Sequence, residues 1–460
     1  MVNLTVQPAL QFIEPRLDPL TLSVVQTGLP WWLKWTKGIS RIDLERGQIL
    51  VEQIALFQQH KTRLLLAFRH PSTADPPCLI HTLGSLVPRL GKTLGIGIHT
   101  PVHAHFMYDR GIPLWAGQSA AWLLPRLGAT PIRRGRLDRQ GLKSARSLLL
   151  EGRFPLAAAP EGGANGHSDI LNPLEPGMAQ LGFWCQEDLL KAQRSEQVII
   201  LPIHMQYTYV GNPRPAMERL LAQLERDCGL TPHPRHPVAQ RLTRLGEHLL
   251  PMMEAFYERY FPKPLTHALK TEDLGIPERL ARLLDIALRI AEFNLNIEPQ
   301  GSLTDRRHRI EQAAWDRIYC LDEEQPPHAA AQGLADRIAQ EAHLHLWHMR
   351  LVETFIAMTS PPTLDLSADM GEHPDFLAES LLRYWALMTR LQGGDPLRQS
   401  APILATRRAT VVIGDPLSVS DRWPDYQHQR RRAIDDLTQT LHTSLAQLMQ
   451  QYSQNRATPL

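Results

Sequence analysis

Leu64-Leu65-Leu66-Ala67-Phe68-Arg69-His70-Pro71-Ser72-Thr73-Ala74-Asp75 joins an apolar run to a histidine and an aspartate five residues apart. The apolar run is typical of a short buried strand. In a straight helix, side chains at this spacing would diverge by roughly 140°. A turn therefore has to bring them together, and proline, serine and threonine directly after the histidine are suitable turn residues. We expect His70 at the end of a strand, with Asp75 folded back onto its ring as the orienting partner of a base.

The composition excludes several classes of protein. The chain has 460 residues and a formal net charge of +2, without a basic tract, which argues against a nucleic-acid partner. Its four cysteines show no CxxC spacing, as expected in a reducing cytoplasm. The chain starts without a signal-peptide pattern, and no apolar run approaches the ~20 residues that cross a bilayer. We therefore expect a cytoplasmic protein without a membrane-spanning segment.

Hydrophobic patterning divides the chain into regions. Residues 61–211 alternate short apolar runs with amphipathic stretches, as in α/β domains. Strands are expected at 64–68, 111–116, 154–159 and 197–203, and helices at 78–90, 119–127, 140–150 and 178–190. Residues 1–60 are expected to be a helical segment, with helical spacing from Ile42 to His60, and residues 212–405 a second helical region that includes helices at 278–294 and 305–321.

The last region, residues 406–460, returns to a strand and a closing helix. Ala409–Leu417 is a strand and turn, and Arg430–Gln451 is amphipathic. A single strand needs partners for its backbone groups. We therefore expect it to join the sheet of residues 61–211, which makes residues 212–405 a large helical insertion within one α/β domain.

The segment Leu29–Trp35 concentrates tryptophan beside lysine. Trp31, Trp32 and Trp35 lie close to Lys34 and Lys37. Indole rings with lysines are typical of an anchor at headgroup depth in a membrane surface. The alternative is a segment that packs on the core while its lysine reaches water. The sequence leaves both interpretations open.

Four short blocks occur in order between residues 70 and 203. They are His70-Pro71-Ser72-Thr73-Ala74-Asp75, Gly128-Ala129-Thr130-Pro131-Ile132-Arg133-Arg134, Ala159-Pro160-Glu161-Gly162-Gly163 and Ile199-Ile200-Leu201-Pro202-Ile203. Together they resemble the glycerolipid acyltransferase family, whose blocks read His-x-x-x-x-Asp, Gly-x-x-Phe-Ile-x-Arg, Phe-Pro-Glu-Gly-Thr-Arg-Ser and an apolar strand ending in proline. Ile413–Leu417 also resembles the strand that follows the fourth block in that family, which supports the insertion.

The resemblance implies a fold, an activity and partners. The fold is α/β, a mixed central sheet flanked by helices. The activity is transfer of a fatty acyl group from an acyl carrier protein or coenzyme A thioester to a glycerolipid hydroxyl at a membrane surface. Lysophosphatidic acid is the leading acceptor; another lysophospholipid, glycerol 3-phosphate or a non-phospholipid alcohol are alternatives. No metal and no bound organic cofactor are implied, and a non-catalytic lipid-binding homologue is the rival from another class.

The same resemblance assigns the site residues. His70 is the general base and Asp75 its partner, because a free hydroxyl needs a base as it attacks. The substrate-binding residues are Ser72 of the first block, Arg133 and Arg134 for the acceptor phosphate, Glu161 for the glycerol or for orienting an arginine, and Gly162 and Gly163 for close backbone approach.

Each assignment has a plainer alternative. By themselves, His70 and Asp75 could be a capping or buried polar pair. The arginines from 133 to 136 could form a solvated basic turn, and Glu161 could be an acid at a helix N-terminus. The block order favours the functional roles. Two departures, Gly163-Ala164 in place of Thr-Arg and Pro131 in place of an aromatic residue, leave the acceptor headgroup open.

Two histidine groups stand outside these blocks. His343, His345 and His348 have a spacing that suits metal ligands, and a histidine-rich metal hydrolase is therefore a further rival. Without a nearby cysteine or matched carboxylates, we expect no metal there. His99, His103 and His105 are expected in a loop or lid between the first two blocks.

Overall fold

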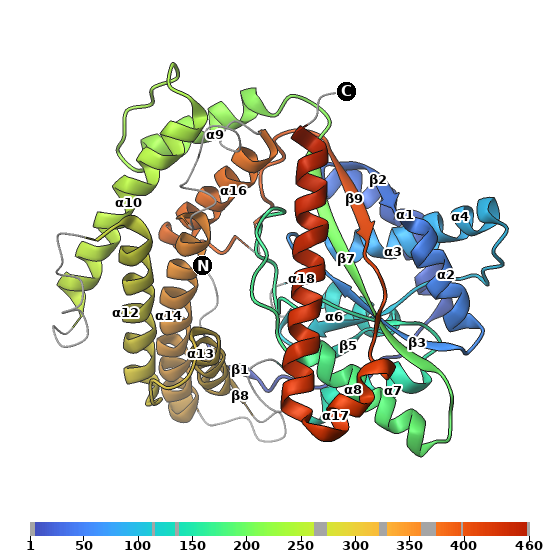
Figure 1. Cartoon of the computed structure of the whole chain (residues 1–460). Helices are drawn as coiled ribbons and strands as arrows, with labels where there is room; N and C mark the ends of the chain where they lie inside the picture. The colour runs from blue at the N-terminus through green and yellow to red at the C-terminus, as the bar shows by residue number, and fades with distance from the viewer. Residues whose placement is uncertain are drawn as a thin grey trace. The chain divides into compact units, whose positions relative to one another are not determined.

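The chain folds into two compact units. The computed structural model describes residues 5–112, 116–133, 138–261, 274–321, 329–359, 374–396 and 399–457. An α/β unit comprises Phe12–Ile132, Asp138–Asn212 and Ala405–Leu460. A helical unit comprises Met1–Gln11, Arg133–Leu137 and Pro213–Leu404 (Figure 1).

The α/β unit is built on a mixed sheet with strand order β2-β9-β7-β3-β6-β4-β5, with β10 also paired to β7. The strands are β2 (Ile39–Glu45), β3 (Thr62–Phe68), β4 (His105–Asp109), β5 (Thr130–Ile132), β6 (Leu156–Ala158), β7 (Gln197–Tyr209), β9 (Arg407–Ile413) and β10 (Leu417–Ser418). Strands β3 to β7 pair in parallel. Strands β9 and β10 run antiparallel to β7, and β2 runs parallel to β9. The fold class is therefore α/β, with a central mixed sheet flanked by helices.

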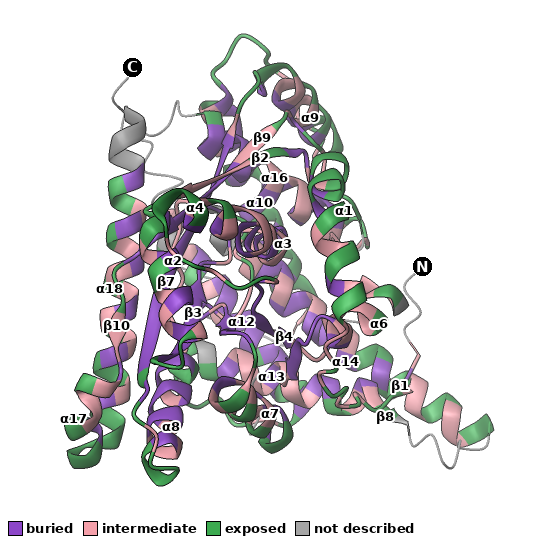
Figure 2. Cartoon of the chain, turned by 90° about the vertical axis from the view of Figure 1, so that its right-hand side faces the viewer, coloured by how far each residue is buried: buried purple, intermediate pink, exposed green. Residues whose placement is uncertain are grey.

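Helices cover both faces of this sheet. One face carries α1 (Pro19–Lys37), α2 (Gly47–Gln58), α3 (Asp75–His81), the π-helical turn η1 (Thr82–Leu86), α4 (Val87–Leu94) and α6 (Gln118–Arg126). The other carries α7 (Arg139–Glu151), α8 (Gly177–Lys191), α17 (Trp423–His428) after the 3-10 turn η3 (Ser420–Arg422), and α18 (Arg430–Ala457). Both faces of the central strands are thus buried, as Figure 2 shows for β3 and β7.

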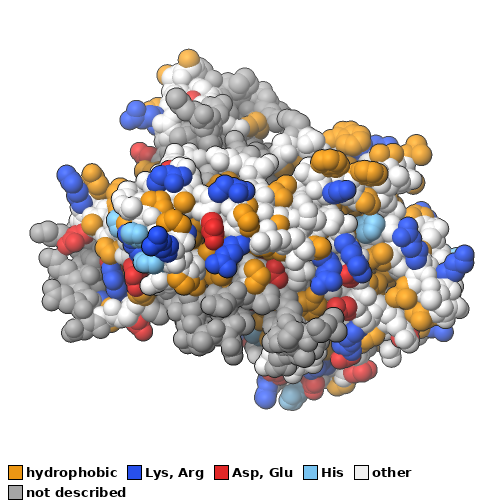
Figure 3. All heavy atoms as spheres, turned by 90° about the horizontal axis from the view of Figure 1, so that it is seen from above, with side chains coloured by type: hydrophobic (Ala, Val, Ile, Leu, Met, Phe, Trp, Pro, Cys, Tyr) orange, Lys and Arg blue, Asp and Glu red, His pale blue; other side chains and the backbone are white. Residues whose placement is uncertain are grey.

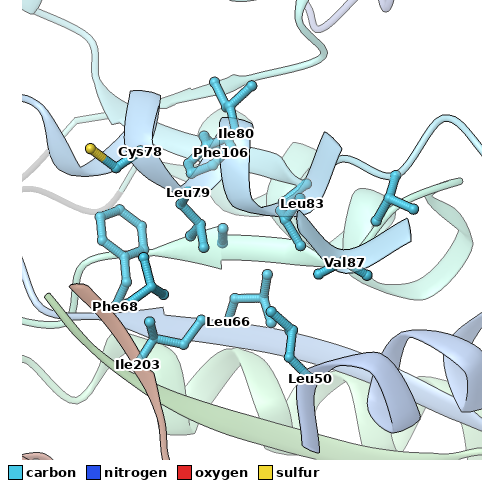
Figure 4. Packing of buried hydrophobic residues seen from close by; sticks show 14 of the residues in the cluster. Leu50, Leu66, Phe68, Cys78, Leu79, Ile80, Leu83, Val87, Phe106 and Ile203 are labelled. Atoms are coloured by element: carbon cyan, nitrogen blue, oxygen red, sulfur yellow. The ribbon is translucent and has the colours of Figure 1, made fainter. Parts of the chain in front are cut away.

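The apolar run that precedes His70 packs on both sides. Because successive side chains of a strand point to opposite faces, Leu64, Leu66 and Phe68 join one core cluster, whereas Leu65 and Ala67 join the other. Figure 4 shows Leu66 and Phe68 directed toward the helical segment above them. A strand that is buried on both faces has a continuous apolar sequence, which is why β3 could be predicted.

Two expectations about secondary structure are wrong. Residues 39–45 form β2 instead of helix, because their Ile-Ser-Arg-Ile-Asp-Leu-Glu alternation suits a strand at the edge of the described sheet, where it pairs with β9. Arg46, at φ 53°, separates this strand from α2. The strand expected at 111–116 is instead β4 at His105–Asp109, and residues 113–115 lie outside the described residues.

Strand β9 lies between β2 and β7 in this sheet. The backbone N–H of Val210 donates to the carbonyl of Thr406 at 2.9 Å, directly beside the β7–β9 ladder. The chain therefore leaves the sheet after β7 and re-enters it at a neighbouring position. This pairing holds together the two ends of a long intervening segment.

The helical unit contains α9 (Arg214–Asp227), α10 (Val238–Tyr260), α12 (Ile276–Leu295), α13 (Leu303–Ile318), α14 (Ala329–Thr359) and α16 (Pro374–Leu391), with a parallel pair of short strands, β1 (Gln7–Pro8) and β8 (Tyr319–Leu321). Helix α13 begins with a capping box from Ser302 and ends before β8, so the helix expected to continue to residue 321 is shorter. A buried ion pair joins Arg241 to Glu225 at 3.0 and 2.5 Å. A second joins Arg306 to Glu292 at 2.7 and 2.8 Å.

His103 and His105 are buried in the core. His103 lies in a loop, as expected, whereas His105 begins β4, so the expectation of a loop or lid is wrong for His105. The Nε2 of His103 lies 2.9 Å from the carbonyl of Leu127, and the Nδ1 of His105 lies 2.8 Å from that of Gly128. Both side chains are buried, with the ring of His103 against Phe106 and that of His105 against Phe154. Burial lowers the pKa of His103 to about 4.

The depressed pKa of His103 predicts acid sensitivity. An unfolded chain protonates this histidine near 6.5, and the folded chain only near pH 4. Between these values the unfolded state binds more protons, so stability falls as the pH drops through this window. We expect His103→Gln, which can still donate to Leu127, to reduce the difference in thermal unfolding midpoint between the two ends of the window. Exposed His99→Gln is the control, and an unchanged difference in the His103 variant would contradict the assignment.

Candidate active site

His70 lies where the chain leaves the end of β3. The N–H of Arg69 donates to the carbonyl of Ile203 at 2.8 Å and extends the β3–β7 ladder by one residue. The chain then turns, and α3 begins at Asp75, whose N–H donates to the carbonyl of Ser72 at 3.0 Å. This turn brings the Nδ1 of His70 to 2.9 Å from the Oδ2 of Asp75.

The carboxylate of Asp75 is fully buried and fully engaged. Its Oδ2 also accepts the N–H of Ser72 at 2.8 Å, and its Oδ1 accepts the hydroxyl of Tyr207 from β7. Burial raises the pKa of Asp75, while the hydrogen bonds from His70 and Tyr207 oppose that rise. With both oxygens engaged, the carboxylate holds the His70 ring in one orientation and favours the tautomer protonated at Nδ1.

The opposite edge of the His70 ring is open to a ligand. The side chain is 19% exposed, whereas that of Asp75 is 0% exposed. Within the described residues, no side chain or backbone group hydrogen-bonds to Nε2. Phe68 packs against the ring edge-on, with 5.9 Å between the centroids. The arrangement leaves Nε2 on the edge of the ring that faces away from the buried carboxylate of Asp75.

Glu161 supports His70 from a neighbouring strand. It follows β6, which pairs with β3, and its side chain is 0% exposed. Its Oε1 accepts the backbone N–H of His70 at 3.0 Å, and its Oε2 accepts the side-chain amide of Asn165 and the N–H of Asn172, both at 3.0 Å. The N–H of Asn165 donates in turn to the carbonyl of His70 at 3.2 Å.

Arg69 completes this buried network. Its Nε lies 3.4 Å from Oε1 of Glu161, and its guanidinium donates to the carbonyls of Ser168 and Ile170. Glu161 thus contacts an arginine, Arg69, and its predicted part in substrate binding stays a prediction. Sequence reasoning gave Arg69 no role, although an arginine that directly continues an apolar strand was the available signal.

The remaining block residues shape the turn and the loop. The Oγ of Ser72 accepts the N–H of Ala74 at 3.2 Å and so stabilises the turn before α3. Gly162 has φ +73°, and a Cβ there would lie 2.2 Å from a carboxylate oxygen of Glu175. Its N–H donates to the carbonyl of Ala159 at 3.2 Å. Gly163 follows in the same loop, and both glycines are partly exposed.

The predicted phosphate ligands are Arg133 and Arg134. Arg133 forms an ion pair with Asp316 within the helical unit. Arg134 lies outside the described residues. Their assignment to an acceptor phosphate stays a prediction.

Two histidines of α14, His345 and His348, are buried in the helical unit. The Nδ1 of His348 lies 3.0 Å from the hydroxyl of Tyr257, and its ring packs edge-on against Phe261. Burial lowers the pKa of His348 to about 4 and also lowers that of His345. These contacts favour a packing role for the two rings.

Sequence reasoning also missed two cations and a tyrosine near the His70 turn. Tyr207 donates to Asp75, Lys37 donates to Thr73 at 3.1 Å, and the Arg407 guanidinium lies 5.2 Å from the centroid of the Tyr207 ring. Each comes from an element remote in sequence, so no local pattern could have linked them to His70.

Comparison with known protein families, with curated proteins and with solved structures finds no match for this chain. The resemblance of the four blocks therefore stays a prediction from the sequence.

The buried network predicts a positioning role for Glu161. Both side-chain oxygens of Glu161 accept N–H groups. In Glu161→Gln an NH2 group replaces one of these oxygens, so two hydrogen-bond donors would face each other there. Breaking a buried ion pair in this way should cost about 3 kcal/mol of stability, measured by denaturant unfolding. Glu187→Gln, which disturbs a partly exposed pair with Lys191, should cost less than about 0.5 kcal/mol. Unchanged stability with a raised KM would instead indicate direct substrate contact by Glu161.

Proposed function

We propose that this protein is an O-acyltransferase of the glycerolipid type. It moves an acyl group from an acyl carrier protein or coenzyme A thioester to a hydroxyl of a glycerolipid acceptor, with lysophosphatidic acid as the leading acceptor and phosphatidic acid as the product. The observation that carries this proposal is the His70–Asp75 pair, 2.9 Å apart, with the carboxylate buried and Nε2 open. The four sequence blocks supply the reaction class, and the mixed α/β sheet is compatible with that family's fold.

In the proposed reaction, the hydroxyl oxygen of the acceptor attacks the thioester carbon while the Nε2 of His70 takes its proton. A neutral imidazole suits this task near pH 7. The imidazolium that forms is stabilised by Asp75, whose carboxylate is already hydrogen-bonded to Nδ1. Because the nucleophile belongs to the acceptor, no acyl-enzyme forms.

Collapse of the tetrahedral intermediate completes the reaction. The carbon–sulfur bond breaks, the thiol leaves with the proton returned by His70, and the new ester remains on the acceptor. Glu161 and Arg69 act as positioning residues in this scheme, since they hold the backbone of His70 without facing solvent. Arg134, with Arg133, is proposed from the resemblance to bind the acceptor phosphate, and Ser72, Gly162 and Gly163 to line the site.

Removal of the base is the direct test. His70→Ala should lower acyl transfer by at least ~10²-fold, the usual contribution of general base catalysis. The assay uses both thioester donor classes and a panel of lysophospholipid, glycerol 3-phosphate and neutral alcohol acceptors. Exposed His99→Ala should transfer at the wild-type rate. If the wild-type protein transfers no more acyl group than the His70 variant with any combination of donor and acceptor, a non-catalytic lipid-binding role replaces this proposal.

The proposed substrates reside in membranes, and α1 offers a surface that suits one. Leu20, Val24, Trp31 and Trp35 recur at helical spacing and are 79%, 73%, 67% and 72% exposed. Leu22, Leu29 and Leu33 on the opposite side are buried. Figure 3 shows hydrophobic side chains gathered over the part of the α/β unit where α1 lies.

Lysines accompany this apolar stripe. Lys34 lies 6.0 Å from the centroid of the Trp35 ring, and Lys37 lies 5.8 Å from that of Trp32. Apolar rings flanked by lysines suit the boundary of an anionic bilayer. Among the described residues, none of the helices combines the length and apolar character needed to cross one. The proposed mode of association is therefore peripheral.

Replacing Trp31, Trp32 and Trp35 by serine tests this association. We expect flotation with phosphatidylcholine–phosphatidylglycerol vesicles to fall at least ~10-fold, because three large rings no longer enter the interface. The matched control is Leu190→Ser on α8, which is exposed but lies on the other face of the sheet. Equal binding by wild type and the triple variant would reject the anchor.

A further inference from the structure

Two cations meet at the edge of the His70 turn. Lys37 ends α1, and Arg407 begins β9. The Nη2 of Arg407 donates to the backbone carbonyl of Lys37 at 3.0 Å, so the two residues are in direct contact. Both are partly buried. Residues that are 370 positions apart in sequence, both of them cationic, are thus in contact.

Within the described residues, neither cation forms an ion pair with a carboxylate. By contrast, the neighbouring Arg408 lies 3.7 Å from Asp43, and Arg46 is paired with Asp415. Burial, and then the positive charge of Arg407, lowers the pKa of Lys37. Two adjacent, partly desolvated cations are unfavourable unless an anion neutralises them. The pair therefore has unused capacity for an anionic ligand.

Both cations lie near the His70–Asp75 turn, Lys37 through a contact with Thr73 and Arg407 through a contact with Tyr207. The Nζ of Lys37 donates to the hydroxyl of Thr73, an exposed residue of the His70–Asp75 turn, at 3.1 Å. The guanidinium of Arg407 lies 5.2 Å from the centroid of the ring of Tyr207, whose hydroxyl donates to Asp75. An anion held by this pair would thus lie beside the turn that carries His70.

We propose that Lys37 and Arg407 bind the phosphate monoester of the acceptor substrate. This inference rests on the proposed acyl transfer, because it identifies the ligand as the molecule whose hydroxyl His70 activates. Lysine supplies a point charge, and arginine can supply two parallel N–H donors to phosphate oxygens. The pair would act together with Arg134 or in its place.

The position of the pair favours the acceptor phosphate over the phosphates of the donor. In a lysophosphatidate, only the glycerol carbons separate the phosphate from the reacting hydroxyl. In coenzyme A or a carrier-protein thioester, the whole pantetheine arm separates the phosphates from the reacting carbon. Lys37, which contacts the His70 turn, and Arg407, which contacts Lys37, are therefore within reach of the acceptor headgroup.

Calorimetric titration of the full-length chain tests the site without requiring activity. The probes are a water-soluble short-chain lysophosphatidate, the monoacylglycerol of the same chain length and coenzyme A. We expect Lys37→Met and Arg407→Gln each to weaken lysophosphatidate binding about 10-fold or more, as loss of a charge-assisted bond to phosphate should. Monoacylglycerol and coenzyme A should bind as before, and Lys37→Arg should restore most of the affinity.

Two neighbours are matched controls. Lys34→Met removes an exposed lysine from the same helix, and Arg408→Gln removes the next arginine of the same strand. Neither should weaken lysophosphatidate binding. Thermal unfolding of each variant checks that a loss of binding is not a loss of fold, which matters for Arg407 because it also bonds the Lys37 carbonyl.

Four results would overturn the inference. Lysophosphatidate binding could be unaffected in both variants, or weakened only by Arg134→Ala. Coenzyme A binding could fall instead, which would place the donor's phosphate at this pair. Binding of the phosphate-free monoacylglycerol could fall equally, which would indicate a structural role.

The two proposals fail separately. Phosphate-dependent binding through Lys37 without any acyl transfer would support the anion site and contradict the proposed reaction. Acyl transfer that depends on His70 but not on Lys37 or Arg407 would support the reaction and contradict the anion site.

Discussion

The arrangement around His70 depends on the hydrogen bonds that the buried carboxylate of Glu161 accepts. Strands β3 and β6 are parallel neighbours, so the segments that follow them emerge at the same edge of the sheet. Glu161 joins these segments by accepting the N–H of His70 and groups from its own loop. A buried charge has to be paired and hydrogen-bonded. Arg69 supplies the opposite charge, and the position of His70 is constrained as a result.

A second constraint comes from β7, the long strand at the centre of the sheet. Tyr207 reaches from it to Asp75, and Tyr209 pairs in register with Arg407 on β9. One strand therefore connects the orienting carboxylate with the cation pair. The alternation of side chains along β7 and β9 decides which residues face the His70 turn. This explains how a strand encoded near the end of the chain contributes to a site encoded near its start.

The same strand pair accommodates the long segment between β7 and β9. The chain leaves and re-enters the α/β unit at neighbouring positions, held by the bond from Val210 to Thr406. An insertion whose ends are adjacent disturbs the host sheet little. The helical unit keeps its own buried ion pairs, such as Arg241 with Glu225, and its own core. Its packed histidines belong to that core.

The sequence by itself determined the local features of the site. The apolar run before His70, the turn residues after it and the spacing to Asp75 were sufficient to predict a strand end with a folded-back carboxylate. Most helices of the α/β unit could also be predicted, because amphipathic spacing is a local property. The alternating edge strand β2 and the histidine-bearing β4 were missed, since neither is a continuous apolar run. Only the tertiary structure decided which distant residues contact the His70 turn and its neighbours: Glu161 behind His70, Tyr207 on Asp75, Lys37 on Thr73, and Arg407 beside Tyr207. These contacts depend on strand order and register, which pair segments hundreds of residues apart and leave no periodic trace in the chain.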